Sequence, residues 1–159
     1  MKTVIGAAVL ATLTGTGLGA AAPSGDTLDR KVLSLAAARK IVAAAEADAL
    51  ARRVGVVIVV VDSAGTIIEL ARMDTAQVAS VNVGVGKART AAIYRRPSRD
   101  FEEQIRNGRV AALALADATP LQGGLPIVID GAVVGAVGVS GDTPQVDEAI
   151  AAAGAAAIR

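Results

Sequence analysis

The chain of 159 residues contains no histidine, no cysteine and no tryptophan. Histidine and cysteine are the side chains that most often ligate metal ions or act as nucleophiles, so the commonest forms of both chemistries are excluded. Without cysteine no disulfide can form, and stability must come from packing within the chain or between subunits. Aromatic residues are scarce as well, because Tyr94 and Phe101 are the only ones.

An excess of charge of either sign is also lacking. The chain carries 16 Lys and Arg residues against 15 Asp and Glu residues, which gives a formal net charge of +1. Loss of Lys2 with the N-terminal segment would bring this charge to zero. A balanced chain has no electrostatic reason to bind nucleic acid, so we expect no such partner.

The N-terminal segment is typical of an exported protein. Lys2 is followed by an apolar run from Val4 to Leu18 and then by small residues that include Ala21. This pattern predicts a signal peptide over residues 1–21 and a periplasmic or extracellular location. An uncleaved anchor is the alternative, although the run is shorter than the about 20 residues of a membrane-spanning helix.

The domain organisation follows from cleavage after Ala21. Residues 22–31 are polar and rich in turn formers, which predicts a flexible leader. Residues 32–159 are long enough to bury a core and are predicted to form one domain. Once the signal peptide is removed, we expect no attachment to a membrane.

Helical periodicity predicts a helix over 35–53, with Ser34 as its N-cap and Gly55 beyond its end. A second helix is predicted over 75–93, although Gly84 and Gly86 interrupt it. Each glycine costs a helix interior about 1 kcal/mol relative to alanine. Either close packing requires these glycines or the helix begins later than residue 75.

Two shorter helices are expected further along the chain. Ser98 is a candidate N-cap for a helix over 99–107, and Thr143 with Pro144 favours the start of a C-terminal helix. Residues 110–115 are a short apolar segment that fits a helix or a strand equally well.

Strand patterns form two hairpins. Residues 56–61 are continuously β-branched, which predicts a strand covered on both faces, and residues 66–72 follow after a turn. Residues 125–129 and 132–139 are joined by Asp130 and Gly131, a pair that favours a two-residue hairpin loop. Together the elements predict an α+β fold with a largely antiparallel sheet flanked by helices.

Several motifs recur in a fixed order through the predicted domain. They are Leu33-Ser-Leu-Ala-Ala-Ala, Val59-Val-Val-Asp62-Ser-Ala-Gly65, Arg72-Met73-Asp74, Lys87-Ala-Arg-Thr-Ala, Arg96-Pro97, Gly123-Gly124-Leu-Pro126-Ile, Asp130-Gly131, Gly135-Ala-Val-Gly-Val-Ser-Gly141 and Asp147-Glu148. In this order they resemble the GlcG/HbpS-like haem-binding family, which also occurs as the C-terminal domain of some corrinoid adenosyltransferases. The resemblance implies a profilin-like domain that assembles into homo-oligomers and, in exported members, binds haem.

The resemblance points to the segment after residue 86 as a ligand site. The candidate ligand-binding residues are Lys87, Arg89, Thr90, Tyr94 and Arg96. Their cations could pair with haem propionates or with the carboxylate of a small organic acid. Because histidine is absent, Thr90 is the candidate ligand of haem iron, with Tyr94 one helical turn later and Met73 as further donors.

Structural roles are the alternatives for the same residues. The charged side chains can form a solvated surface with Asp100, Glu102 and Glu103 as opposing charges. Lys87 can instead face inward and hold a carboxylate at a subunit interface. Thr90 can bond back to a carbonyl one turn earlier, while Tyr94 and Phe101 can anchor the core. Asp147 is expected to favour the start of its helix rather than to hold a metal.

Two classes of function remain. The first is a secreted oligomeric protein that binds haem or a related tetrapyrrole. The second is a cofactor-free enzyme, or a binding protein, that acts on a small organic acid through Lys87 and the arginines. The sequence leaves open whether the chain is an enzyme at all.

Overall fold

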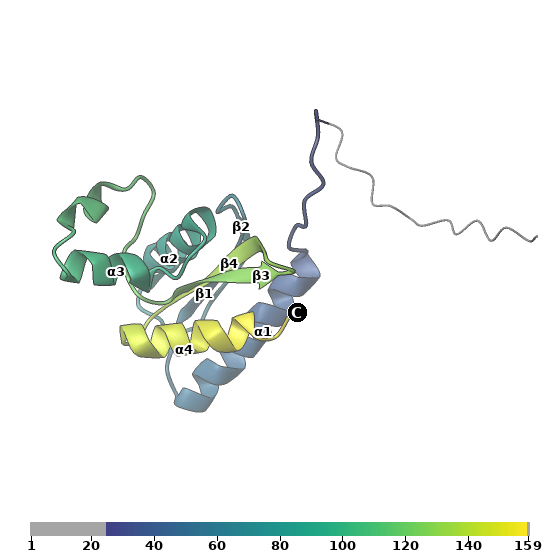
Figure 1. Ribbon diagram of the computed structural model, residues 1–159. Helices are drawn as coiled ribbons and strands as arrows, with labels where there is room; N and C mark the ends of the chain where they lie inside the picture. The colour runs from purple at the N-terminus through teal and green to yellow at the C-terminus, as the bar shows by residue number, and fades with distance from the viewer. Residues whose placement is uncertain (1–24, 159) are drawn as a thin grey trace, which may run out of the picture. The chain divides into compact units, whose positions relative to one another are not determined.

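Four antiparallel strands lie at the centre of the fold, in the order β2-β1-β4-β3 (Figure 1). The computed structural model describes residues 25–158. The strands are β1 (Val57–Asp62), β2 (Ile67–Arg72), β3 (Gly124–Ile129) and β4 (Ala132–Ser140). Both predicted hairpins are confirmed, and the pairing of β1 with β4 joins them into one sheet.

Helices cover both faces of this sheet. They are α1 (Leu35–Arg52), α2 (Ser80–Tyr94), α3 (Arg99–Arg106), the 3-10 helix η1 (Val110–Ala114) and α4 (Pro144–Ala155). Helices α1 and α4 pack on one face, and α2 packs on the other (Figure 1). The predicted α+β class is therefore confirmed.

The register of β1 explains why its sequence is continuously apolar. Ile58 and Val60 face α1 and α4, whereas Val57 and Val59 face α2. All four side chains are fully buried. A strand with helices on both faces has no solvent side, so the usual alternation of apolar and polar residues is lost.

Two glycines of the sheet let α2 approach its backbone. Gly124 of β3 pairs with Gly138 of β4. A Cβ atom on Gly138 would lie 2.4 Å from the Gly84 carbonyl oxygen and 2.5 Å from the Ala88 nitrogen. A Cβ on Gly124 would lie 2.2 Å from the Lys87 carbonyl oxygen. Helix α2 therefore lies directly on strand backbone at this point.

Several element boundaries differ from the sequence predictions. Helix α2 begins at Ser80 rather than at residue 75, because residues 73–79 form successive turns that bury Ala76 against β1. Helix α1 ends at Arg52, and Arg53 takes the left-handed conformation that was expected near Gly55. Helix α3 ends at Arg106, and the undecided segment 110–115 contains a 3-10 helix.

The three predicted caps have different outcomes. Ser34 caps α1 as predicted, because its hydroxyl accepts a hydrogen bond from Ala37 N. Thr143 caps α4, because its hydroxyl accepts a hydrogen bond from Val146 N. Ser98 does not cap α3: its fully buried hydroxyl instead bonds to the backbone of Leu121 and Gly124. The prediction failed because a buried backbone donor elsewhere in the fold takes the hydroxyl.

Most residues covered by the N-terminal predictions lie outside the described part of the chain. The predicted signal peptide over 1–21 lies outside this part, as does the start of the leader. Residues 25–31 of the leader contain no helix or strand. None of the helices in the described part of the chain is both long and apolar enough to cross a membrane.

The contact between α2 and the sheet predicts unequal effects of two alanine substitutions. Gly138→Ala should lower the free energy of unfolding by about 1–3 kcal/mol, because the new methyl meets backbone atoms that cannot move separately. Gly84→Ala places its Cβ 3.3 Å from a Val59 methyl, which can shift, and it removes a helix glycine. Its effect should be close to zero. Urea unfolding measures the free energy of unfolding of both variants. Equal losses in the two variants would contradict this packing.

Candidate functional site

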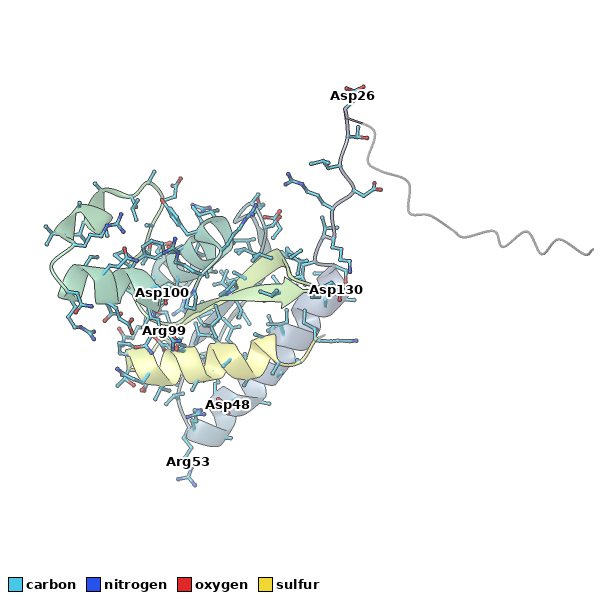
Figure 2. All side chains as sticks on the ribbon, viewed as in Figure 1. Asp26, Asp48, Arg53, Arg99, Asp100 and Asp130 are labelled. Atoms are coloured by element: carbon cyan, nitrogen blue, oxygen red, sulfur yellow. The ribbon has the colours of Figure 1, made fainter. Side chains whose placement is uncertain are left out.

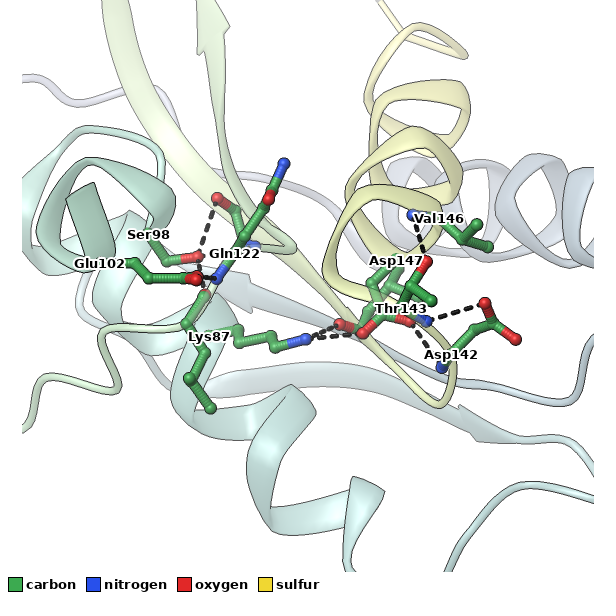
Figure 3. A network of polar contacts seen from close by, with 11 residues as sticks. Lys87, Ser98, Glu102, Gln122, Asp142, Thr143, Val146 and Asp147 are labelled. Carbon is green, nitrogen blue, oxygen red and sulfur yellow. Dashed lines mark hydrogen bonds and ion pairs between the residues drawn. The ribbon is translucent and has the colours of Figure 1, made fainter. Parts of the chain in front are cut away.

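A buried ion pair joins the layers on the two faces of the sheet. Lys87 Nζ of α2 lies 2.7 Å from Asp147 Oδ2 of α4 and 3.0 Å from the Val139 carbonyl oxygen (Figure 3). The two side chains are only 4% and 3% exposed. At this burial each charge depends on the other, because an unpaired ion would carry the full cost of desolvation.

The surroundings of this pair leave room for no further side chain. Gly123 lies beside it with a φ of +123°, and a Cβ there would be 2.9 Å from Lys87 Nζ. The second oxygen of Asp147 accepts a hydrogen bond of 3.0 Å from Asp142 N. Burial raises the pKa of the Asp147 carboxyl, and the hydrogen bonds from Lys87 and Asp142 N partly offset this rise.

A second ion pair connects α3 to α4. Arg99, at the start of α3, donates to Glu148 Oε1, and its side chain lies on the α4 side of α3 (Figure 2). Arg99 is 46% exposed, whereas Glu148 is 12% exposed. The other oxygen, Glu148 Oε2, is buried and has no hydrogen-bond partner among the described residues.

Residues 116–122, which we call the strap, pass over the C-terminal half of α2. The strap is held by side chains of other segments. Thr90 Oγ1 accepts a hydrogen bond of 2.7 Å from Thr119 N, and the Tyr94 hydroxyl donates one of 2.7 Å to Ala116 O.

Two further side chains hold the end of the strap. Ser98 Oγ donates to Leu121 O at 2.6 Å, and Glu102 Oε2 accepts from Gln122 N at 2.7 Å (Figure 3). Among the described residues, the backbone hydrogen bonds within the strap are local ones, such as that from Leu121 N to Thr119 O. The position of the strap therefore depends on side chains.

The predicted site residues divide into separate environments. Thr90 is fully buried, and its hydroxyl also donates to Gly86 O, so the predicted bond to a carbonyl one turn earlier is confirmed. Lys87 faces inward, as one interpretation had it, but its carboxylate belongs to the same chain. Arg89 is half-buried beside the Gly65 turn.

Arg96 lies apart from these residues. It is exposed, and its guanidinium carbon is 5.1 Å from the centre of the Phe101 ring. Phe101 is buried, as expected, and packs edge-on against Tyr94 with ring centres 5.0 Å apart. The structure thus brings Thr90 and Tyr94 together under the strap and leaves Arg96 in solvent beside them.

Sequence reasoning missed several residues of this arrangement. Asp147 was expected to act at the start of its helix, whereas its main partner is Lys87. Ser98 was expected to be a cap, and Glu102 was expected on a solvated surface. The sequence around these residues gave no sign of their partners, because the pairing depends on contacts between distant segments.

Two further observations concern metal ligands and pockets. The described residues hold no group of three or more His, Cys, Asp or Glu side chains that could bind a metal ion. A shallow pocket of about 470 Å³ lies between the start of α1, the end of β3 and the end of α4. It contains none of the predicted site residues.

The antiparallel sheet with helices on both faces is that of a profilin-like α+β domain. Residues 33–156 match the family model described as "Haem degrading protein HbpS-like". "Protein GlcG" of Escherichia coli K12 is 40% identical over 109 residues, which cover 69% of this chain and 81% of that protein. The chain belongs to the HbpS-like family.

Solved structures agree with this assignment. A double mutant of Streptomyces reticuli HbpS superimposes with a TM-score of 0.79 at 29% identity and covers 90% of this chain and 98% of that one. The "PduOC:Heme Complex" superimposes with a TM-score of 0.75 at 26% identity. This match covers 81% of this chain and 96% of the PduOC chain.

The buried pair predicts strong energetic coupling between Lys87 and Asp147. Lys87→Met should cost about 3–5 kcal/mol in the free energy of unfolding, because it leaves a buried carboxylate without its cation. Adding Asp147→Asn should recover part of this loss, since no unpaired charge remains. Urea unfolding of both single variants and the double variant measures the coupling.

The exposed pair of Arg52 and Asp48 serves as the control for this cycle. Its nitrogen and oxygen are 2.6 Å apart, but the pair lies on the surface of α1. A coupling of only about 0.3–0.5 kcal/mol is expected there. Additive losses at Lys87 and Asp147 would show that the buried pair contributes no more than a surface pair.

Proposed function

We propose that this protein binds haem or a related tetrapyrrole. The observation that carries the proposal is the similarity to the haem complex of PduOC over most of the chain, within a family named for haem. The proposed ligand region is the C-terminal half of α2 with the residues that follow it. Bound haem would supply an iron centre that can take further ligands.

The donor atoms near this region restrict how iron could be held. Met73, one of the predicted donors, packs against the core on the α1 and α4 side of the sheet. The other predicted donors are the side-chain oxygens of Thr90 and Tyr94. Both are already hydrogen-bonded, Thr90 to Gly86 O and Thr119 N and Tyr94 to Ala116 O. As these residues lie, they do not fit as iron ligands.

The surface around α2 does offer contacts for the rest of a tetrapyrrole. Arg95 and Arg96 follow Tyr94 and are exposed, so that they can pair with propionates. Val110, Leu113 and Leu121 are 64%, 66% and 43% exposed and provide apolar surface. These propionate and apolar contacts support the proposal independently of any iron ligand.

Lys87 gives no comparable support to the small-acid alternative. Its ammonium already holds Asp147 and the Val139 carbonyl, and the side chain is 4% exposed. A carboxylate substrate would have to displace Asp147 from this buried position. No contact of the described residues favours that exchange, and we keep haem as the proposed ligand.

Titration with haemin tests the proposal. The mature protein should give a saturable change in the Soret band at micromolar haemin. Arg96→Ala should weaken binding about two- to fivefold, as expected for the loss of one exposed ion pair. Arg39→Ala, which removes an exposed cation on the opposite face of the sheet, should leave the affinity unchanged. A titration without saturation would remove haem from consideration.

Export and assembly are part of the same proposal. The predicted signal peptide supports a periplasmic or extracellular protein, and the family resemblance supports a homo-oligomer. Mass spectrometry of protein from a periplasmic extract should find a mature chain that begins at Ala22. Native mass spectrometry of this material should find a multiple of that mass. A full-length chain confined to the cytoplasm would contradict export. A monomer at high protein concentration would contradict assembly.

A further inference from the structure

The two predicted donors of α2 are the same groups that hold the strap in place. Thr90 and Tyr94 each use a hydroxyl to bind the strap backbone, at Thr119 N and Ala116 O. Thr90 is completely buried beneath the strap. A ligand cannot contact the Thr90 oxygen while the strap keeps this position.

We propose that the strap is a gate over Thr90 and Tyr94, which opens as a unit while the sheet and its helices stay folded. This inference rests on the proposed function for the identity of the ligand, since an iron-bearing tetrapyrrole is the group that would take these oxygens. Opening exposes both oxygens together, because the same movement breaks their hydrogen bonds to the strap. The Thr90 hydroxyl keeps its bond to Gly86 O within α2.

The way the strap is attached favours such a movement. Four side chains hydrogen-bond its backbone: Tyr94 and Ser98 donate, and Thr90 and Glu102 accept. Its own backbone hydrogen bonds are local among the described residues, so they can survive a change of position. The sheet is held differently, by continuous backbone pairing of four strands. Segments with few buried backbone contacts open at a lower free energy than the core.

Gly86 shows how closely the strap lies against α2. A Cβ on Gly86 would be 2.1 Å from Thr119 Oγ1 and 2.8 Å from Thr119 Cβ. A change of side-chain rotamer cannot relieve the contact with Cβ, so the strap backbone would have to move. The helix itself would tolerate alanine, which is the better helix former. Gly86→Ala is therefore a substitution that disfavours the closed strap and leaves both hydroxyls in place.

Hydrogen–deuterium exchange without ligand tests the gate directly. In the wild type, the amides of Thr119 and Gln122 should exchange faster than those of β1, through an opening confined to the strap. Gly86→Ala should accelerate their exchange strongly. Gly84→Ala, two residues earlier in the same helix, should not, because its Cβ points at the Val59 side chain rather than at the strap.

Glu102→Ala provides a second variant that leaves α2 unchanged. It removes the acceptor of Gln122 N and should accelerate strap exchange by about tenfold or more, as expected for a hydrogen bond to a charged group. Glu102 also pairs with Arg106 at 2.9 Å, so Arg106→Ala is the matched control for loss of that pair alone. Two results would contradict the gate. One is that strap amides exchange only when the core unfolds, at the same rate as the amides of β1. The other is that Glu102→Ala and Arg106→Ala accelerate strap exchange equally.

Haemin separates this inference from the proposed function. If the gate controls access, haemin should increase exchange at Thr119, and Gly86→Ala should bind haemin more tightly because less of the binding energy is spent on opening. Saturable binding with unchanged protection at Thr119 would overturn the gate and leave the function intact. An absence of binding would overturn the function, and ligand-free exchange would then decide the gate alone.

Discussion

The approach of α2 to the sheet is the constraint on which the rest of the structure depends. Gly124 and Gly138 lie opposite each other on β3 and β4, and α2 rests on their backbone. Only at this depth does the ammonium of Lys87 reach the Val139 carbonyl and the carboxylate of Asp147. One close contact thus connects the helix on one face of the sheet to the helix on the other.

Helix α2 has two functions that its sequence combines in a few residues. Lys87 stabilises the fold through a buried ion pair, and Thr90 and Tyr94 hold the strap. Gly86 comes directly before Lys87 in the chain and gives the strap room. A ligand that takes the two hydroxyls must compete with the strap, whereas the ion pair can remain closed. Binding would then be coupled to a local opening and not to unfolding of the core.

Much of the fold could be predicted from the sequence, but little of the candidate site could. The β-branched run of β1 and the Asp130-Gly131 turn predicted both hairpins, because strand pattern and turn chemistry are local properties. Ser98 could not be predicted, since its hydroxyl bonds to residues more than 20 positions away. The partnership of Lys87 with Asp147 spans 60 positions and follows from packing. Gly86 was noticed as an anomaly, and the contact with Thr119 explains it.

The central claim is that the strap opens before a ligand reaches the α2 hydroxyls, and stopped-flow mixing with monomeric haemin tests it most directly. If opening comes first, the observed rate of binding reaches a plateau as the haemin concentration rises, and the plateau is higher in Glu102→Ala than in the wild type. A rate that rises linearly with haemin concentration throughout, and is the same in both proteins, would contradict the claim.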